Sequence, residues 1–234
     1  MTIAARVDGL DWLALQASLW ERGYAQAPAF LDADECAALV ASYETAAFRS
    51  RVDMGRHRFG EGEYKYLADP LPPLVGSLRE HLYPPLARVA NAWAEALGDV
   101  ERFPPSQEEL RARCRAAGQT RPTPLLLRYG PGGYNCLHQD LYGGVAFPLQ
   151  AIFPLCRPGL DHTGGELVLV EQRPRAQSAA EVLSPGRGDL VVFTTRVRPA
   201  RGRHGWHRVQ MRHGVSRVRS GSRLALGVIF HDAR

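Results

Sequence analysis

The sequence predicts an α+β fold in which helices of the first half support an antiparallel β-sandwich or barrel. Apolar residues at helical spacing, with capping residues beside them, dominate residues 1–123. From Pro124 onward, short β-branched and apolar runs alternate with Gly and Pro, which is typical of antiparallel sheets. A chain of 234 residues can bury a sizeable core. We therefore expect one folding unit with a helical support region, residues 1–123, and a core, residues 124–234.

The first helices are predicted from their boundaries as well as their spacing. Residues 10–22 have apolar side chains at helical spacing and end at Gly23, and a short strand is expected over 24–30. Asp32 is followed three residues later by Glu35, which is the pattern of a capping box at a helix start.

Two further helices precede the β-rich half. One is expected over residues 85–97, entered after the pair Pro84–Pro85 and stopped by Gly98. Another begins where Ser106 is followed by Glu109 and runs to about residue 117.

The second half contains seven segments with the composition of strands. Turn residues separate them, so each is expected to pair with a neighbour in an antiparallel sheet. The segments are residues 125–129, 134–140, 145–155, 166–171, 189–195, 206–213 and 223–231.

Composition excludes several classes of protein. Apolar residues make up 45% and charged residues 23% of the chain, as in ordinary globular proteins. No window approaches the ~18 apolar residues of a membrane span, so we expect no membrane partner and a cytoplasmic location. The four cysteines lack C-x-x-C spacing, which argues against a disulfide framework or structural zinc. We expect Cys136 to be a buried free thiol, with a place in the lining of a site as the alternative.

Positive charge is concentrated at the C-terminal end. Residues 194–234 contain ten arginines and one acidic residue, a local charge of +9 against −4 for the remainder. Such a segment suggests an anionic ligand, either phosphate or carboxylate. A general preference for arginine is the alternative explanation, since the chain has 28 arginines and one lysine.

A histidine and an aspartate in the second half are candidates for metal ligands. On a strand, His138 and Asp140 face the same side, because side chains alternate with a period of two. With a second histidine they would complete a 2-His-1-carboxylate face, which leaves open positions on ferrous iron. The candidates for that histidine are His162, His204, His207, His213 and His231.

We predict His213 as the third ligand. It ends the segment 206–213, and Arg223 opens the next segment, so the two residues would lie on neighbouring strands of a hairpin. The arginine fork suits a carboxylate, such as the distal carboxylate of iron-bound 2-oxoglutarate. His207 lies on the same face of the strand as His213 and remains the alternative ligand.

Four motifs follow one another around these residues. They are R-Y-G-P-G-G-Y-N-C-L-H-Q-D-L-Y from Arg128, G-G-E from Gly164, G-D-L-V-V-F from Gly188 and R-H-G-V-S-R-V-R-S-G-S-R-L from Arg212. In this order they resemble the iron(II)/2-oxoglutarate-dependent dioxygenase superfamily. That resemblance implies a double-stranded β-helix, a jelly-roll or cupin-like core.

A narrower resemblance extends from about Arg56 to the C-terminus. The runs N-C-L-H-Q-D-L-Y-G, E-Q-R-P-R-A-Q-S, R-H-G-V-S-R and G-V-I-F-H-D-A resemble a bacterial family of oxygenases predicted to demethylate damaged DNA bases oxidatively. This chain has His207 where that family tends to have an aromatic residue.

The resemblance implies the cofactors and their ligands. Fe(II), 2-oxoglutarate and dioxygen are expected, with His138, Asp140 and His213 holding the iron. Arg223 would bind the distal carboxylate of 2-oxoglutarate, and the Tyr129 hydroxyl would hydrogen-bond to the same molecule. Packing of the Tyr129 ring under the barrel mouth is the alternative.

The expected substrate is an alkylated nucleobase, with single-stranded DNA as the partner. A candidate substrate loop at residues 53–70 contains R-H-R-F-G-E-G-E-Y-K-Y-L, whose cations and aromatics suit phosphate contact and base stacking, with two glycines as hinges. The same Y-K-Y-L is also typical of an amphipathic strand with its aromatics inward. Substrate-binding roles are predicted for Arg58, Tyr64, Tyr66, Asn135 and Tyr142.

Two alternative functions remain open. One is a 2-oxoglutarate-dependent hydroxylase that acts on a protein side chain, an amino acid or a small metabolite. The other is a non-enzymatic nucleic-acid-binding β-barrel whose histidines are structural. Dependence on metal would distinguish the DNA demethylase and the hydroxylase from the non-enzymatic barrel.

Overall fold

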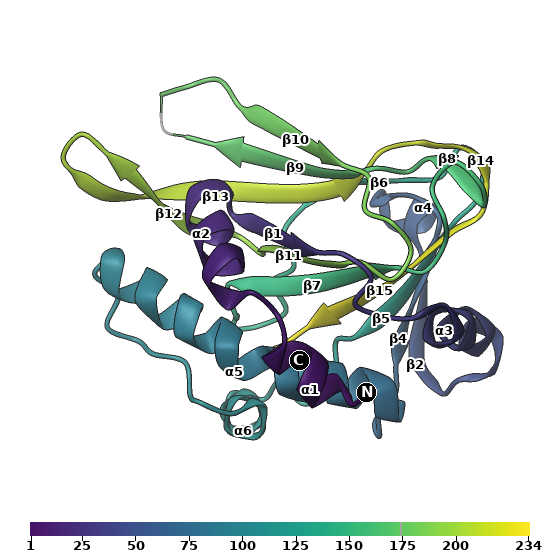
Figure 1. Ribbon diagram of the computed structural model, residues 1–234, viewed down its shortest axis with the longest axis horizontal. Coiled ribbons are helices and arrows are strands. Elements are labelled where there is room, and N and C mark those ends of the chain that lie inside the picture. Colours follow the sequence, from purple (N-terminus) through teal and green to yellow (C-terminus); the bar gives the residue numbers. More distant parts are fainter. Residues whose placement is uncertain (174) are drawn as a thin grey trace.

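Two facing antiparallel sheets form the centre of the protein, and helices cover the outer face of one of them (Figure 1). The computed structural model describes residues 1–173 and 175–234. A seven-stranded sheet has the order β1-β11-β7-β15-β5-β4-β2, and a six-stranded sheet has the order β10-β9-β13-β6-β3 with β12 paired to β13. β8 and β14 form a small third sheet.

The elements have the following bounds. The helices are α1 Ile3–Asp8, α2 Trp12–Arg22, α3 Ala33–Thr45, α4 Met54–His57, α5 Pro73–Ala96 and α6 Gln107–Ala116. The strands of the seven-stranded sheet are β1 Tyr24–Ala27, β2 Phe48–Asp53, β4 Glu63–Leu67, β5 Leu125–Tyr129, β7 Leu149–Pro154, β11 Leu190–Thr194 and β15 Arg223–Ile229. The other strands are β3 Gly60–Glu61, β6 Tyr134–His138, β8 His162–Gly164, β9 Leu167–Gln172, β10 Ala179–Leu183, β12 Val197–Gly202, β13 Gly205–Val215 and β14 Val218–Gly221.

Alternation along the strands separates the two faces of the seven-stranded sheet. On one face, residues such as Leu149, Ala151 and Phe153 of β7 pack in the same apolar cluster as the helices. On the other face, Ile152 packs with side chains of β9 and β13 in the space between the sheets. The helices therefore pack on the outer face of one sheet, and a candidate site can form between the two sheets.

The first 123 residues supply strands as well as helices. β1 pairs with β11, and β4 pairs with β5, so this segment extends the seven-stranded sheet at both edges. The capping box predicted at Asp32 and Glu35 is present at the start of α3. The short strand expected after Gly23 ends at Ala27.

α5 continues through Pro84 and Pro85, where the sequence predicted a helix start. Tyr83 and Leu86, on either side of the pair, are fully buried, as are apolar residues of the turns before and after them. Burial of this continuous face outweighs the loss of backbone hydrogen bonds that proline causes inside a helix.

The candidate substrate loop at residues 53–70 is not an open loop. It forms α4, β3 and β4, and its two central glycines are sites of close backbone approach rather than hinges. A β-carbon at Gly60 would lie 2.3 Å from the carbonyl oxygen of Tyr134, and one at Gly62 would lie 3.0 Å from that of Arg128. Both glycines also have positive φ, which favours glycine at these positions.

A buried ion pair ties α5 to the end of β15. Arg79 donates to Asp232 at 2.6 Å and to the carbonyl oxygens of Ile229 and Phe230. Both side chains are almost fully buried, and Asp232 is the acidic partner of Arg79, while Arg111 Nε also lies 3.4 Å from Asp232 Oδ2. In the part of the chain that the structure describes, none of the helices has the length and apolar character needed to span a membrane.

Candidate metal centre

His138, Asp140 and His213 meet between the sheets, and we call them the His-Asp-His triad. His138 ends β6, and β13 pairs with this strand so that the Cα atoms of His138 and His213 are partners. Asp140 follows two residues after His138, on the same side of the chain. Their ligand atoms all lie within 4.8 Å of one another. The predicted ligands are thus brought together from segments 75 residues apart.

Hydrogen bonds set the orientation of the His138 ring. Its Nδ1 lies 2.8 Å from the carbonyl oxygen of Cys136, an acceptor that requires the proton on Nδ1. The lone pair of Nε2 is therefore free, and this atom lies 3.6 Å from Asp140 Oδ1. Support of one ring nitrogen by a carbonyl is typical of a histidine that binds metal through the other.

Asp140 and His213 complete the face. Asp140 Oδ2 lies 3.1 Å from His213 Nε2, and the two imidazole rings of the triad are tilted with centroids 4.2 Å apart. The Asp140 side chain is 13% exposed and that of His213 is 9% exposed. Two imidazoles and one carboxylate, largely shielded from water, fit a ferrous ion and leave part of its coordination sphere open.

The protonation states of Asp140 and His138 at neutral pH favour metal binding. Burial alone would raise the pKa of Asp140, but the hydrogen bond from His213 and the nearby histidine charges hold the pKa of this carboxyl well below its usual range. Burial, with the charge of His213, lowers the pKa of His138. A carboxylate and an imidazole are therefore available in the forms that bind metal.

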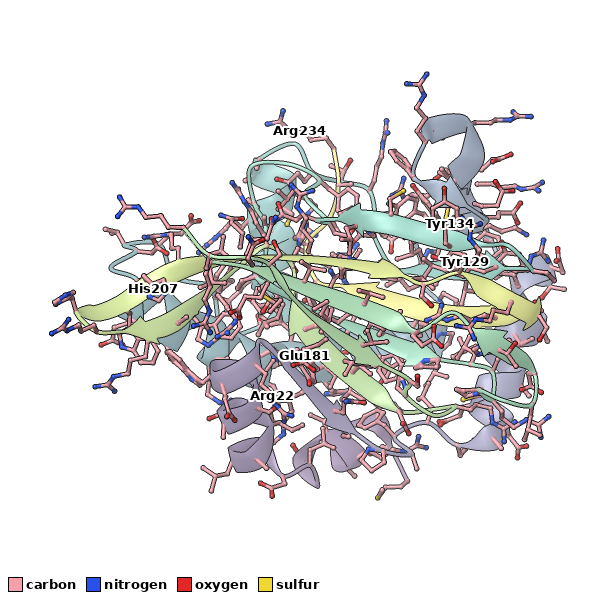
Figure 2. The ribbon with its side chains drawn as sticks, turned by 90° about the horizontal axis from the view of Figure 1, so that it is seen from above. Arg22, Tyr129, Tyr134, Glu181, His207 and Arg234 are labelled. Carbon is pink, nitrogen blue, oxygen red and sulfur yellow. The ribbon has the colours of Figure 1, made fainter. Side chains whose placement is uncertain are left out.

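The alternative ligand His207 is not part of this cluster. It lies on β13 six residues before His213, where the strand leaves the sheet to form a hairpin with β12. Figure 2 shows His207 on that outlying hairpin, far from Tyr129 and Tyr134. The Arg-rich segment around it forms a β-hairpin.

The triad opens into a cavity of about 370 Å³ between the sheets, which we call the triad cavity. Its walls are mostly apolar and aromatic, with residues such as Ile152, Leu167 and Phe193 beside His213. This size is within the range of small-molecule sites. All the residues predicted to bind substrate line it, namely Arg58, Tyr64, Tyr66, Asn135 and Tyr142.

Arg223 and Tyr129 do not line the triad cavity. They are register partners on β15 and β5, and both are buried. Arg223 borders a smaller cavity of about 170 Å³ beside Gly165, where a β-carbon would lie 2.7 Å from Arg223 Cδ.

Both of these side chains have a buried polar atom without a partner. Among the described residues, Arg223 Nη1 and the Tyr129 hydroxyl accept or donate no hydrogen bond. Burial lowers the pKa of Arg223 and raises that of Tyr129. An anion between them would satisfy both atoms, which fits the distal carboxylate of 2-oxoglutarate.

A family model covers most of the chain. It matches residues 62–233 and is described as Oxygenase-NA, an oxygenase catalysing oxidative methylation of damaged DNA. The chain belongs to the Oxygenase-NA family. The uncharacterized proteins Rv2227 and MT2286 of Mycobacterium tuberculosis are both 49% identical to it over 164 residues, which is 70% of this chain and 70% of each relative.

Solved structures show that this member of the Oxygenase-NA family has the predicted double-stranded β-helix fold. A prolyl hydroxylase from Trichoplax adhaerens, in complex with a hypoxia inducible factor peptide fragment, has a TM-score of 0.56 and 14% identity, covering 97% of this chain and 91% of its own. An oxidoreductase of the 2OG-Fe(II) oxygenase family from Burkholderia pseudomallei has a TM-score of 0.55 and 18% identity, covering 96% and 93%.

The protein is therefore an oxygenase, and the prediction of an enzyme is confirmed. Family membership excludes the non-enzymatic barrel. The likeness to solved structures confirms the predicted fold, and the His-Asp-His triad predicted from the sequence can hold a metal ion.

Sequence reasoning missed Gln150, whose Nε2 lies 3.5 Å from His213 Nε2. It is the one polar residue of a fully buried strand, and a lone polar residue in an apolar run could have pointed to it. Cys136 is exposed and lines the triad cavity, so the expected buried thiol was wrong and the alternative was right. The exposure of Cys136 follows from the shortness of β3, which pairs with β6 only at Tyr134 and Asn135.

Proposed function

We propose that this oxygenase removes methyl groups from alkylated nucleobases in DNA by oxidative demethylation. The observation that supports the proposal most is the His-Asp-His triad at the wall of a cavity with aromatic sides. The family description names damaged DNA as the target. It speaks of methylation, but an oxidant that acts on an N-methyl group removes it, whereas addition of a methyl group would require a methyl donor.

The proposed role of the triad is to hold the metal. His138 and His213 would each provide a ring nitrogen, and Asp140 a carboxylate oxygen. When bound, Fe(II) with 2-oxoglutarate and dioxygen supplies the oxidant that inserts one oxygen atom into a C–H bond of the substrate. The apolar lining around the triad would keep water away from that step.

Arg223 and Tyr129 would fix the cosubstrate. Their unpartnered polar atoms lie on the inner face of the seven-stranded sheet, opposite the sheet that carries His138 and His213. In the described part of the chain, buried Arg223 Nη1 has no hydrogen-bond partner, so it is available to a carboxylate. The cosubstrate would then link the two sheets.

The triad cavity suits a planar base that is flipped out of the stacked DNA strand. Tyr64 and Tyr66 stand edge to face with ring centroids 5.3 Å apart, and they offer aromatic surface to a planar ligand. Asn135 provides amide groups that can read the edge of a base. Arg58 is exposed at the rim, where it can reach a phosphate.

The chemistry accounts for every atom of the methyl group. Hydroxylation of an N-methyl group gives an N-hydroxymethyl group, whose carbon–nitrogen bond breaks to release formaldehyde and the restored base. Each turnover converts one 2-oxoglutarate and one dioxygen into succinate and carbon dioxide, and the second oxygen atom of dioxygen enters the new hydroxyl group. A base must be out of the duplex for this reaction, so single-stranded DNA is the expected substrate.

The test compares an N-methylated single-stranded oligonucleotide with its unmodified counterpart. We expect formaldehyde and succinate in equal amounts from Fe(II)-loaded protein with the methylated strand, and neither product from the His138→Ala variant. Succinate that forms at the same rate with either strand, without formaldehyde, would contradict the DNA substrate. That result would favour the hydroxylation of a protein side chain, an amino acid or a small metabolite.

A further inference from the structure

Two tyrosine hydroxyls form a chain that ends on the aspartate of the triad. The Tyr142 hydroxyl donates to Asp140 Oδ1 at 2.7 Å, and the Tyr66 hydroxyl donates to Tyr142 at 3.0 Å. Tyr66 comes from β4 and is 7% exposed, while Tyr142 lies two residues after Asp140. The chain therefore joins the metal-ligand segment to the opposite sheet.

We propose that Tyr142 and Tyr66 are positioning residues that present one oxygen of Asp140 to the metal. Because Tyr142 occupies Oδ1, the carboxylate turns Oδ2 toward His213, at 3.1 Å. A free carboxylate would exchange its two oxygens by rotation about the last bond of the side chain. The inference rests on the proposed function, since it takes the His-Asp-His triad to be the metal site.

The surroundings of the tyrosines keep the chain in place. The Arg49 guanidinium lies over the Tyr66 ring, 4.1 Å from its centroid, and Arg49 Nε donates to the carbonyl oxygen of Pro122 at 2.7 Å. On the other side, the Tyr142 ring lies 5.8 Å from the ring of buried His231. Neither tyrosine can turn away without breaking these contacts, so the hydroxyls are held where Asp140 needs them.

The direction of the hydrogen bonds is also favourable. Each hydroxyl donates toward Asp140, so the donation from Tyr66 strengthens that from Tyr142. Donation to a carboxylate is a charge-assisted bond, which is stronger than one between neutral groups. The arrangement favours the ionised carboxylate that a metal requires.

Tyr142 and Tyr66 would therefore contact a substrate differently from what their predicted substrate-binding role suggests. Their hydroxyls are already engaged with Asp140, so a substrate in the triad cavity meets their rings and not their hydroxyls. Tyr64 provides a matched control, because it stands on the same strand as Tyr66 and lines the same cavity but makes no hydrogen bond to Tyr142 or Asp140.

The test is the affinity of metal-free protein for Mn(II), measured by the loss of the free-ion signal in electron paramagnetic resonance. We expect Tyr142→Phe to weaken binding roughly 10- to 100-fold, as loss of an outer hydrogen-bond partner typically does. Tyr66→Phe should weaken it less, and Tyr64→Phe should leave it unchanged. The thermal midpoint of each metal-free variant shows whether the fold is intact.

The outcomes separate this inference from the proposed function. If wild-type protein binds Mn(II) and Tyr142→Phe binds it equally well, the positioning role is wrong. Unchanged affinity with a raised KM for methylated DNA would make Tyr142 a substrate-binding residue instead. If the wild-type protein binds no Mn(II), the proposed metal site fails and the positioning role fails with it. If Tyr142→Phe does not fold, Tyr66→Phe decides in the same way.

Discussion

His231 is fully buried, and its ring lies 5.8 Å from the ring of Tyr142. Its Nδ1 accepts a hydrogen bond from the backbone nitrogen of Phe147 at 3.2 Å, so this nitrogen carries no proton in the folded protein. Burial lowers the pKa of His231 to about 4. The residue therefore contributes to the fold as a neutral acceptor, and its protonation opposes folding.

The first prediction concerns the stability of metal-free protein in acid. Because an unfolded histidine has a pKa near 6.5, the unfolded chain takes up a proton before the folded chain does. The free energy of unfolding should fall as pH drops from about 6.5 to about 4, by up to about 3 kcal/mol from His231. His231→Asn keeps an acceptor for Phe147, and denaturant titrations should show a shallower decline for it. Equal slopes for the two proteins would contradict this.

The second prediction concerns the cation for 2-oxoglutarate. Arg223→Ala should raise the KM for 2-oxoglutarate roughly 10- to 100-fold, the equivalent of one charge-assisted hydrogen bond, with a smaller effect on kcat. The exposed Arg219→Ala on β14 is the matched control and should leave both constants unchanged. An unaltered KM in Arg223→Ala would show that the carboxylate binds elsewhere.

At the level of elements, β6 and β13 approach each other unusually closely beside the triad. The register shifts between His213 and Val215, and the residue between them is Gly214. A β-carbon there would lie 2.6 Å from the carbonyl oxygen of Asn135, in backbone that cannot turn aside. The glycine therefore allows β13 to bring His213 up to His138.

The third prediction follows from this close approach. Gly214→Ala should push the two strands apart, lowering the thermal midpoint and weakening Mn(II) binding together. Gly76→Ala, in α5, is the control, because open space surrounds its added β-carbon. That substitution should stabilise the protein by roughly 0.5–1 kcal/mol without altering metal affinity. Wild-type metal affinity in Gly214→Ala would show that the spacing of the strands does not set the site.

Local rules were enough to predict the elements that form the site. The alternation of side chains on a strand placed His138 and Asp140 on one side, and this inference needs only the period of a strand. The fold class was predictable for the same reason. The hairpin that we expected to bring His213 beside Arg223 does not form, because β13 and β15 lie in different sheets.

Features that depend on distant packing were not predictable. The proline pair inside α5 is tolerated because of what the helix covers, and the Tyr66–Tyr142 hydrogen bond joins residues 76 apart in sequence. Arg223 packs against Gly165 and is the register partner of Tyr129, and both residues come from other segments. No local pattern contains this information.

For the whole molecule, the two sheets contribute different chemistry. The six-stranded sheet and the turn after β6 carry the His-Asp-His triad, and the helix-backed sheet carries Arg223, Tyr129 and the tyrosines of β4 (Figure 1). Metal and cosubstrate would thus meet between the helix-backed seven-stranded sheet and the six-stranded sheet. In this arrangement His213 is the histidine that would complete the metal site.

The most direct test of that central claim is succinate formation from 2-oxoglutarate by protein loaded anaerobically with Fe(II) and then exposed to oxygen. We expect His213→Ala to lose this turnover and to keep the fold, and His207→Ala, on the same face of the same strand, to keep both. If His207→Ala lost turnover and His213→Ala retained it, the metal centre described here would be wrong.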